Sequence, residues 1–88
     1  MKEFEDILVK RFNLQIVWKD PEDSLNGIYI VGRNDIFEMI IGAPGRIDSE
    51  KWVVRLVPHI LVEDIFFLFE GYIEDRFDSR DKVIESLT

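Results

Sequence analysis

Cysteine is missing from this 88-residue chain and histidine occurs once, so few of the usual catalytic and metal-binding groups are present. Without cysteine there is no disulfide, no thiolate zinc site and no thiol nucleophile. The single histidine, His59, forms an i,i+4 pair with Glu63, but a metal site needs three or four ligands. No serine lies in a Gly-x-Ser-x-Gly elbow. We therefore expect no enzymatic activity, no metal and no cofactor.

Long apolar runs and an excess of positive charge are also missing. The longest apolar run, IFFLF, has five residues, whereas a transmembrane helix needs about 20. The opening MKEFEDILVKRF carries acids early and does not resemble a signal peptide. Eighteen acids against 11 bases give a net charge of −7, and such a chain lacks the cations that bind phosphate or anionic lipid. We expect a cytoplasmic protein, in the host cytoplasm if phage-encoded, that binds neither nucleic acid nor membrane directly.

The first two thirds of the chain have the patterns of one helix followed by strands. Apolar residues at helical spacing predict a helix over residues 2–12. Alternation and β-branched or aromatic residues predict four strands, at residues 14–19, 28–31, 36–41 and 51–57. In the first strand, Leu14, Ile16 and Trp18 share one predicted face, and Pro58 is predicted to end the fourth strand.

The remaining residues have the apolar spacing of two helices. One is predicted from about His59 to Phe77, with an apolar stripe that contains Ile65, Phe66 and Phe69. A short helix is predicted from Ser79, as its N-cap, to Leu87. The predicted fold is a single α+β domain over residues 1–88, in the order αββββαα: a small antiparallel sheet of three to four strands in a meander, an N-terminal helix and two C-terminal helices on one face.

Negative charge gathers on the predicted long helix and defines the candidate binding site. Phe67 projects among the acids there, as an aromatic anchor with a polar surround would. The candidate partner-binding residues on this helix and just after it are Glu63, Asp64, Phe67, Glu70, Glu74, Asp75 and Asp78. A second acidic patch, in DPED, consists of Asp20, Glu22 and Asp23.

Such clustering of like charge favours a basic partner, since a surface used only for solubility usually intersperses lysine and arginine. On a helix, six acids between residues 63 and 78 span about 22 Å. Duplex DNA carries about 13 charges in that length. We therefore interpret the chain as a partial mimic of a phosphate backbone, able to occupy a basic nucleic-acid-binding groove of another protein.

Three segments together resemble the small phage-encoded anti-CRISPR proteins that inhibit Cas9: FEDILVKRF, IYIVGRNDIFEMII and EGYIEDRFDSRDKVIESL. The resemblance lies in size, acidity and the order of elements. It implies a non-enzymatic phage counter-defence protein that acts as an acidic plug in the groove of a nuclease such as Cas9.

Other functions remain open at this stage. An immunity-type antitoxin that neutralises a basic nuclease toxin would use the same electrostatics. A small structural homodimer would instead bring exposed hydrophobic residues such as Phe67 or Tyr29 against their own copies across a two-fold axis. A small hydrolase or metal enzyme would have to use His59.

Overall fold

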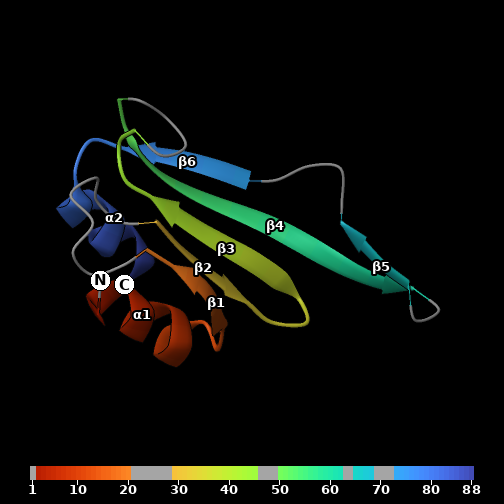
Figure 1. Cartoon of the computed structure of the whole chain (residues 1–88). Coiled ribbons are helices and arrows are strands. Elements are labelled where there is room, and N and C mark those ends of the chain that lie inside the picture. Colours follow the sequence, from red (N-terminus) through yellow and green to blue (C-terminus); the bar gives the residue numbers. More distant parts are fainter. Residues whose placement is uncertain (1, 21–28, 46–49, 63–64, 69–72) are drawn as a thin grey trace.

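The computed structural model describes residues 2–20, 29–45, 50–62, 65–68 and 73–88, and from residue 59 to residue 68 it describes the backbone alone. Figure 1 shows helices at one end of an antiparallel sheet. The elements are α1 (Lys2–Asp6), the π-helical turn η1 (Ile7–Arg11), β1 (Gln15–Lys19), β2 (Tyr29–Arg33), β3 (Phe37–Gly42), β4 (Trp52–Val62), β5 (Ile65–Leu68), β6 (Ile73–Phe77) and α2 (Arg80–Leu87). The α+β class and the antiparallel meander are confirmed.

Strand β4 organises the sheet because three other strands pair with it. The meander β1–β2–β3–β4 is antiparallel throughout. On the side of β4 away from β3, β6 pairs with residues 52–56, and β5 pairs with residues 59–62. Both of these pairings are also antiparallel. The described part of the sheet therefore has six strands, two of them arranged end to end along β4.

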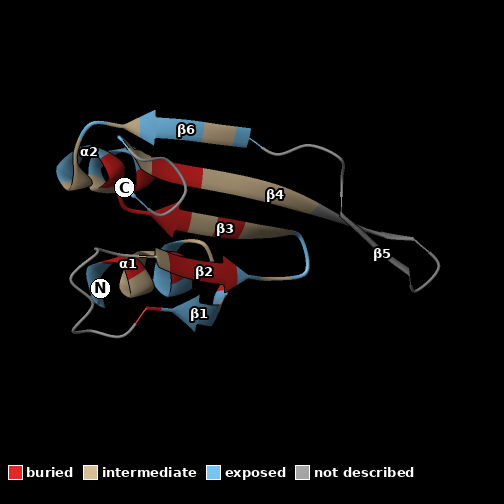
Figure 2. Cartoon of the chain, turned by 45° about the horizontal axis from the view of Figure 1, so that its top comes forward, coloured by how far each residue is buried: buried red, intermediate tan, exposed pale blue. Residues whose placement is uncertain are grey.

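The hydrophobic core lies between one face of the sheet and the helices. Phe4 and Leu8 from the N-terminal helix and Val83 from α2 are completely buried, in one cluster with Ile30 of β2. Each such side chain contributes about 1.5–3 kcal/mol through removal from water. Phe4 also stacks on Trp52 of β4, with ring centroids 5.9 Å apart. Figure 2 shows this burial at the end of the sheet that the helices cover.

Both predicted terminal helices are confirmed; local features explain where the first ends and where the second begins. Asn13 adopts a left-handed φ of 56° after η1, a conformation that asparagine tolerates better than most residues. The next backbone N–H, of Leu14, donates to the Leu8 carbonyl at 2.9 Å. At the other end of the chain, the Ser79 hydroxyl accepts from the Lys82 backbone N–H at 3.2 Å and caps α2.

A bulge in β1 corrects the predicted faces of that strand. Ile16 lies opposite Gly32, but the register then slips, so that Trp18 lies opposite Val31. Since side chains alternate along β2, Ile16 and Trp18 lie on opposite faces of the sheet. The prediction that they share a face is wrong, because simple alternation ignores the extra residue, Val17. Trp18 is accordingly 57% exposed, on the face away from the helices.

The predicted helix from His59 to Phe77 is wrong. The described residues of this segment belong instead to the end of β4, to β5 and to β6. The prediction that Pro58 ends the fourth strand is also wrong, since β4 continues to Val62 and Pro58 pairs with Phe37 of β3. Among the described residues, the order αββββαα is therefore replaced by six strands between an N-terminal helical segment and one C-terminal helix.

The physical reason is that short apolar runs fit both helical and strand periods. The stripe that favours a helix is composed of β-branched and aromatic residues, which pack equally well on a pleated surface. Pairing along β4 gives these residues backbone partners from distant parts of the chain, which a helical wheel cannot represent. Gly71 within the predicted helix would in addition cost about 1 kcal/mol relative to alanine.

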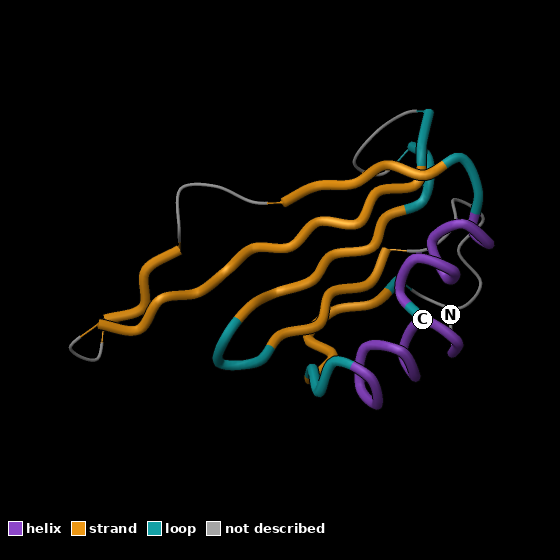
Figure 3. The backbone as a smooth tube through the Cα atoms, turned by 180° about the vertical axis from the view of Figure 1, so that it is seen from behind, coloured by secondary structure: helices purple, strands orange, loops and turns teal. Residues whose placement is uncertain are grey.

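The paired residues 59–62 of β4 and 65–68 of β5 form a two-stranded extension, which we call the hairpin arm. β3 pairs with β4 only as far as Pro58, so the arm continues beyond the end of β3. Seen from behind in Figure 3, the arm projects from the end of the sheet opposite to the helices. The principal extents of the molecule, 42 × 23 × 23 Å, reflect this elongation.

We predict that Gly32→Ala destabilises the fold, although alanine usually stabilises a strand relative to glycine. A Cβ at this position would lie 3.0 Å from Leu14 Cβ and 3.3 Å from Leu8 Cδ1. Overpacking of this kind costs about 1–3 kcal/mol. Urea unfolding of the variant should show a lower free energy of unfolding. An unchanged or higher value would mean that η1 does not close tightly over β2.

Candidate functional site

The structure separates the residues that the sequence grouped into one site. Phe67 lies in β5, where it pairs with Ile60 of β4. Glu74 and Asp75 lie in β6, and Asp78 follows that strand directly. The other acids of the two predicted patches fall outside the described residues: Glu22, Asp23, Glu63, Asp64 and Glu70. No helical face joins these positions, so the predicted single acidic flank is replaced by strands and their connections.

Asp20, Asp75 and Asp78 have different surroundings. Asp20 is only 7% exposed, and its backbone N–H donates to the Tyr29 carbonyl at 3.0 Å. It therefore presents little carboxylate surface to a partner. Asp75 is exposed opposite Val54 of β4. Asp78 is exposed and forms an ion pair with Lys51, the residue just before β4.

Glu74 is the most strongly engaged of the predicted acids. Arg55 of β4 donates to Glu74 Oε1 from Nε at 3.0 Å and from Nη2 at 2.7 Å. Arg76 approaches Glu74 Oε2 at 3.0 Å. The hydrogen bond from Arg55 is the largest cause that lowers the pKa of Glu74 below its ordinary value, and the charges of both arginines act in the same direction. The negative charge of Glu74 is thus balanced by arginines of the same sheet.

Most of the described cations are likewise held by carboxylates of the same chain. At least seven of the ten described lysines and arginines lie within 4.0 Å of a carboxylate. Two of these pairs connect distant elements, Lys19–Glu5 at 2.6 Å and Arg80–Glu3 at 3.2 Å. Exposed pairs of this kind contribute about 0–1 kcal/mol each. Their main consequence here is that the helices and strands are close to electrically balanced.

The excess negative charge lies instead in three segments that connect strands. Residues 21–28, 63–64 and 69–72 contain five acids and no lysine or arginine. They join β1 to β2, β4 to β5 and β5 to β6 respectively. The sequence alone identifies these acids, but only the ion pairs of the sheet show that the cations of the strands are already engaged. These five acids therefore belong to connecting segments that lie outside the described residues.

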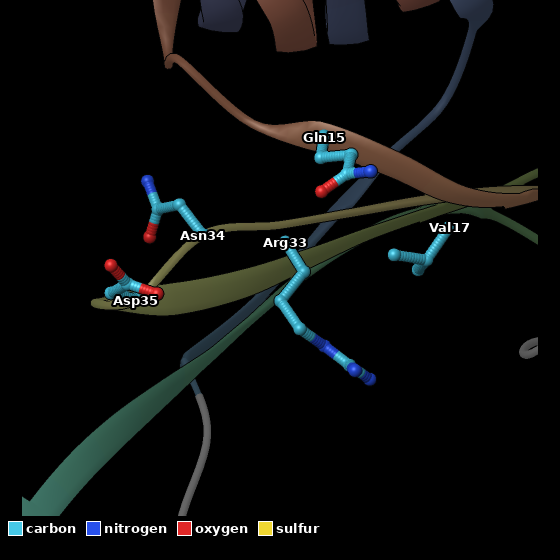
Figure 4. A pocket seen from close by; sticks show the side chains of 5 residues that line it. All are labelled: Gln15, Val17, Arg33, Asn34 and Asp35. Carbon is cyan, nitrogen blue, oxygen red and sulfur yellow. The ribbon is translucent and has the colours of Figure 1, made fainter.

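A pocket of about 380 Å³ lies beside β1, but its chemistry does not suggest catalysis. Figure 4 shows its lining: Gln15, Val17, Arg33, Asn34 and Asp35. Arg33 is held by Glu38 at 2.6 Å, and the Asn34 side-chain oxygen accepts from the Ile36 N–H at 2.8 Å. Among the described residues that line it, there is no histidine, serine or threonine, and hence no hydroxyl nucleophile beside a base.

Sequence reasoning missed two features that the strand pairing creates. The first is the hairpin arm, whose apolar residues are interpreted as the buried stripe of a helix. The second is the row of charges across β4 and β6, where Arg55 lies opposite Glu74. The sequence around Arg55 or Glu74 does not indicate this ion pair, because the two residues are far apart in the chain and only strand pairing brings them together. Residues 60–62 and 65–68 are all apolar. They therefore show no alternation of polar and apolar residues that would have predicted strands.

Metal binding, membrane insertion and likeness to known proteins give no further lead. Among the residues that the structure describes, no group of three or more histidine, cysteine or acidic side chains is placed to hold a metal ion. No helix in the described ranges is long and apolar enough to cross a bilayer. No protein-family model matches the chain, and no significant match was found among curated proteins or solved structures.

We predict that the ion pair of Glu74 makes stability depend on pH in the acidic range. Because the folded-state pKa lies below its ordinary value of 4.5, this contribution is present above that value and is lost as the pH falls through the lower folded-state pKa. Glu74→Gln removes the titrating group. The variant should therefore be less stable than the parent at about pH 6, and the difference should shrink towards about pH 3.

Asp75→Asn is the matched control, because it removes one carboxylate from the neighbouring position of the same strand. Asp75 has no ion pair within the described part of the chain, so Asp75→Asn measures how much of any change comes from the loss of one negative charge in β6 alone. Urea unfolding at several pH values measures both differences. A gap between the parent and Glu74→Gln that stays constant with pH would show that the Arg55–Glu74 pair does not couple titration to folding.

Proposed function

We propose that this chain is a non-enzymatic acidic protein that binds a basic partner protein, in the groove where the partner binds nucleic acid. The supporting observation is the distribution of charge. The cations of the described strands are engaged by carboxylates of the same chain, whereas five acids of the connecting segments have no base within those segments. A partner rich in arginine or lysine supplies the missing counter-charge, and such complementarity steers the encounter of the two proteins.

Strand geometry changes how this binding works. Successive residues rise about 3.3 Å in a strand but about 1.5 Å in a helix. The acids of β6 are therefore spaced about twice as widely as a helix would place them. Since duplex DNA carries about one charge per 1.7 Å, a continuous array of phosphate-like charges is not the basis of recognition. A few ion pairs, combined with apolar contact from the hairpin arm, fit the geometry better.

The partner suggested by the resemblance to anti-CRISPR proteins is a Cas9-type nuclease, which holds nucleic acid in a positively charged channel. Occupation of that channel requires no catalytic group on the inhibitor. The inhibitor has only to arrive before the nucleic acid. This order of addition gives a direct assay: the chain should reduce DNA cleavage when it is added before the target DNA and should have less effect when it is added afterwards.

We predict that reversing the two acids that come between β4 and β5 in the sequence weakens partner capture. The immobilised chain should retain proteins from a bacterial lysate at about 0.05 M NaCl, and either about 0.5 M NaCl or duplex DNA should release them. The double variant Glu63→Lys, Asp64→Lys should retain less, mainly because association is slower.

The matched control is Asp35→Lys with Glu85→Lys, which changes the net charge equally at two exposed acids that have no ion pair among the described residues. This control should bind nearly as well as the parent. Equal losses in the two double variants would mean that only net charge matters. Captured proteins that neither salt nor duplex DNA releases would overturn the proposal of a basic nucleic-acid-binding groove.

A further inference from the structure

The pocket beside β1 lies on the face of the sheet opposite to the hydrophobic core. Gln15 and Arg33 are partners in the register of β1 and β2, and the next residue of β1, Ile16, packs against the core. Because successive pairs alternate between the two faces, Gln15 and Arg33 point away from the core. Figure 4 shows the side chains of Arg33 and Val17 extending to the same side of the ribbon.

The bulge in β1 gives this pocket an apolar wall. Val17 is the extra residue of the bulge and lines the pocket. Trp18 lies opposite Val31 of β2, on the same face as Gln15. Bulges are common beside functional sites because they re-aim side chains. Here Val17 and Trp18 are 46% and 57% exposed, so two successive apolar residues are accessible on the face that holds the pocket.

Arg33 supplies a guanidinium that is fixed by one ion pair and still has donors available. Glu38 Oε1 accepts from Arg33 Nε at 3.1 Å and from Nη2 at 2.6 Å, so one edge of the guanidinium is occupied. A guanidinium has five N–H donors in a rigid fork. Within the described structure the other edge, formed by Nη1 and Nη2, makes no hydrogen bond, and the Arg33 side chain is 51% exposed. Through such an edge arginine binds a carboxylate with two parallel hydrogen bonds.

Two side-chain amides complete the polar part of the pocket, and they differ in what they have to offer. The Asn34 side-chain oxygen accepts from two backbone N–H groups of the β2–β3 turn, at 2.8 and 2.9 Å, and so holds the turn. The Gln15 amide makes no hydrogen bond within the described residues. Gln15 is the cross-strand partner of Arg33, and such partners have Cβ atoms about 4.5–5.5 Å apart. The Gln15 N–H groups can therefore reach the same ligand as the guanidinium.

We propose that this pocket binds a ligand whose carboxylate is attached to an aromatic or branched apolar group. The carboxylate accepts hydrogen bonds from Arg33 and Gln15, and the apolar group packs on Val17 and Trp18. The volume, about 380 Å³, falls in the range of small-molecule sites, about 300–1,000 Å³. A free carboxylic acid and the C-terminal residue of a peptide both carry this chemistry. The site shares no residue with the acidic connecting segments, so the outcome for one proposal does not decide the other.

Asp35 limits the affinity of this pocket for a carboxylate. It lines the pocket, is exposed and has no ion pair among the described residues. Figure 4 shows the guanidinium of Arg33 extending away from Asp35, so the arginine edge is not taken up by this carboxylate. Repulsion between Asp35 and a bound carboxylate is weak in water at such separations. Asp35→Asn should therefore tighten binding about twofold, and Glu85→Gln, which removes the same charge from α2, should leave it unchanged.

Amide NMR spectra of the ¹⁵N-labelled chain measure binding of three matched probes. N-acetyl-L-phenylalanine and 3-phenylpropionate carry the carboxylate, whereas N-acetyl-L-phenylalanine amide lacks it. The two acids should shift the side-chain signals of Gln15 and Trp18 with dissociation constants on the order of 1 mM, as expected for ligands of this size. The amide should bind at least about tenfold more weakly. Tighter binding of the acetylated acid would identify a peptide terminus as the source, and equal binding of the two acids a free carboxylic acid.

Arg33→Lys separates the shape of the guanidinium from its charge. The lysine ammonium keeps the positive charge and can pair with Glu38, but it has no second planar edge. This variant should raise the dissociation constants of both acids at least about tenfold, while its amide spectrum shows that the fold is retained. Equal binding of the acid and its amide to the parent chain would overturn the proposal. So would parent-like binding by Arg33→Lys, or the absence of shifts at Gln15 and Trp18 up to about 20 mM of either acid.

Discussion

The pairing of β4 with three other strands holds the sheet together. Its first half is central in the sheet, between β3 and β6, and contains the buried Val53 and Val54. Its second half has only β5 as a neighbour. Because one strand serves both regions, the packed core and the projecting hairpin arm are parts of a single continuous element. The helices cover the core end, and the arm extends from the other.

Electrostatics in this protein follow from that arrangement. Strand pairing brings Arg55 beside Glu74, and the turn after β6 brings Asp78 beside Lys51. Carboxylates that appear unbalanced in the sequence are therefore matched across strands. Five further acids belong to connecting segments that contain no lysine or arginine, and two of these segments flank β5 in the sequence.

The N-terminal helix, the first three strands and the capped C-terminal helix could be predicted from the sequence because their signals are local. Ser79 as an N-cap, the turn between β2 and β3, and the alternation in residues 36–41 each depend on neighbours within a few positions. The segment from residue 59 to residue 77 could not be assigned in this way. Its apolar residues fit a helical stripe as well as paired strands, and the deciding partners lie in β4.

The composition of the candidate site can be taken directly from the sequence: a strong acidic excess, no cysteine, a single histidine and an aromatic residue among acids. Which of the described acids are balanced, and which described residues lie together, follows from the folded arrangement. Glu74 proved to be paired, Asp20 proved to be buried, and Phe67 was placed on a strand edge. The reason is that charge and apolarity are properties of residues, whereas ion pairing and edge exposure are properties of strand register. Register is set by contacts between residues distant in the chain.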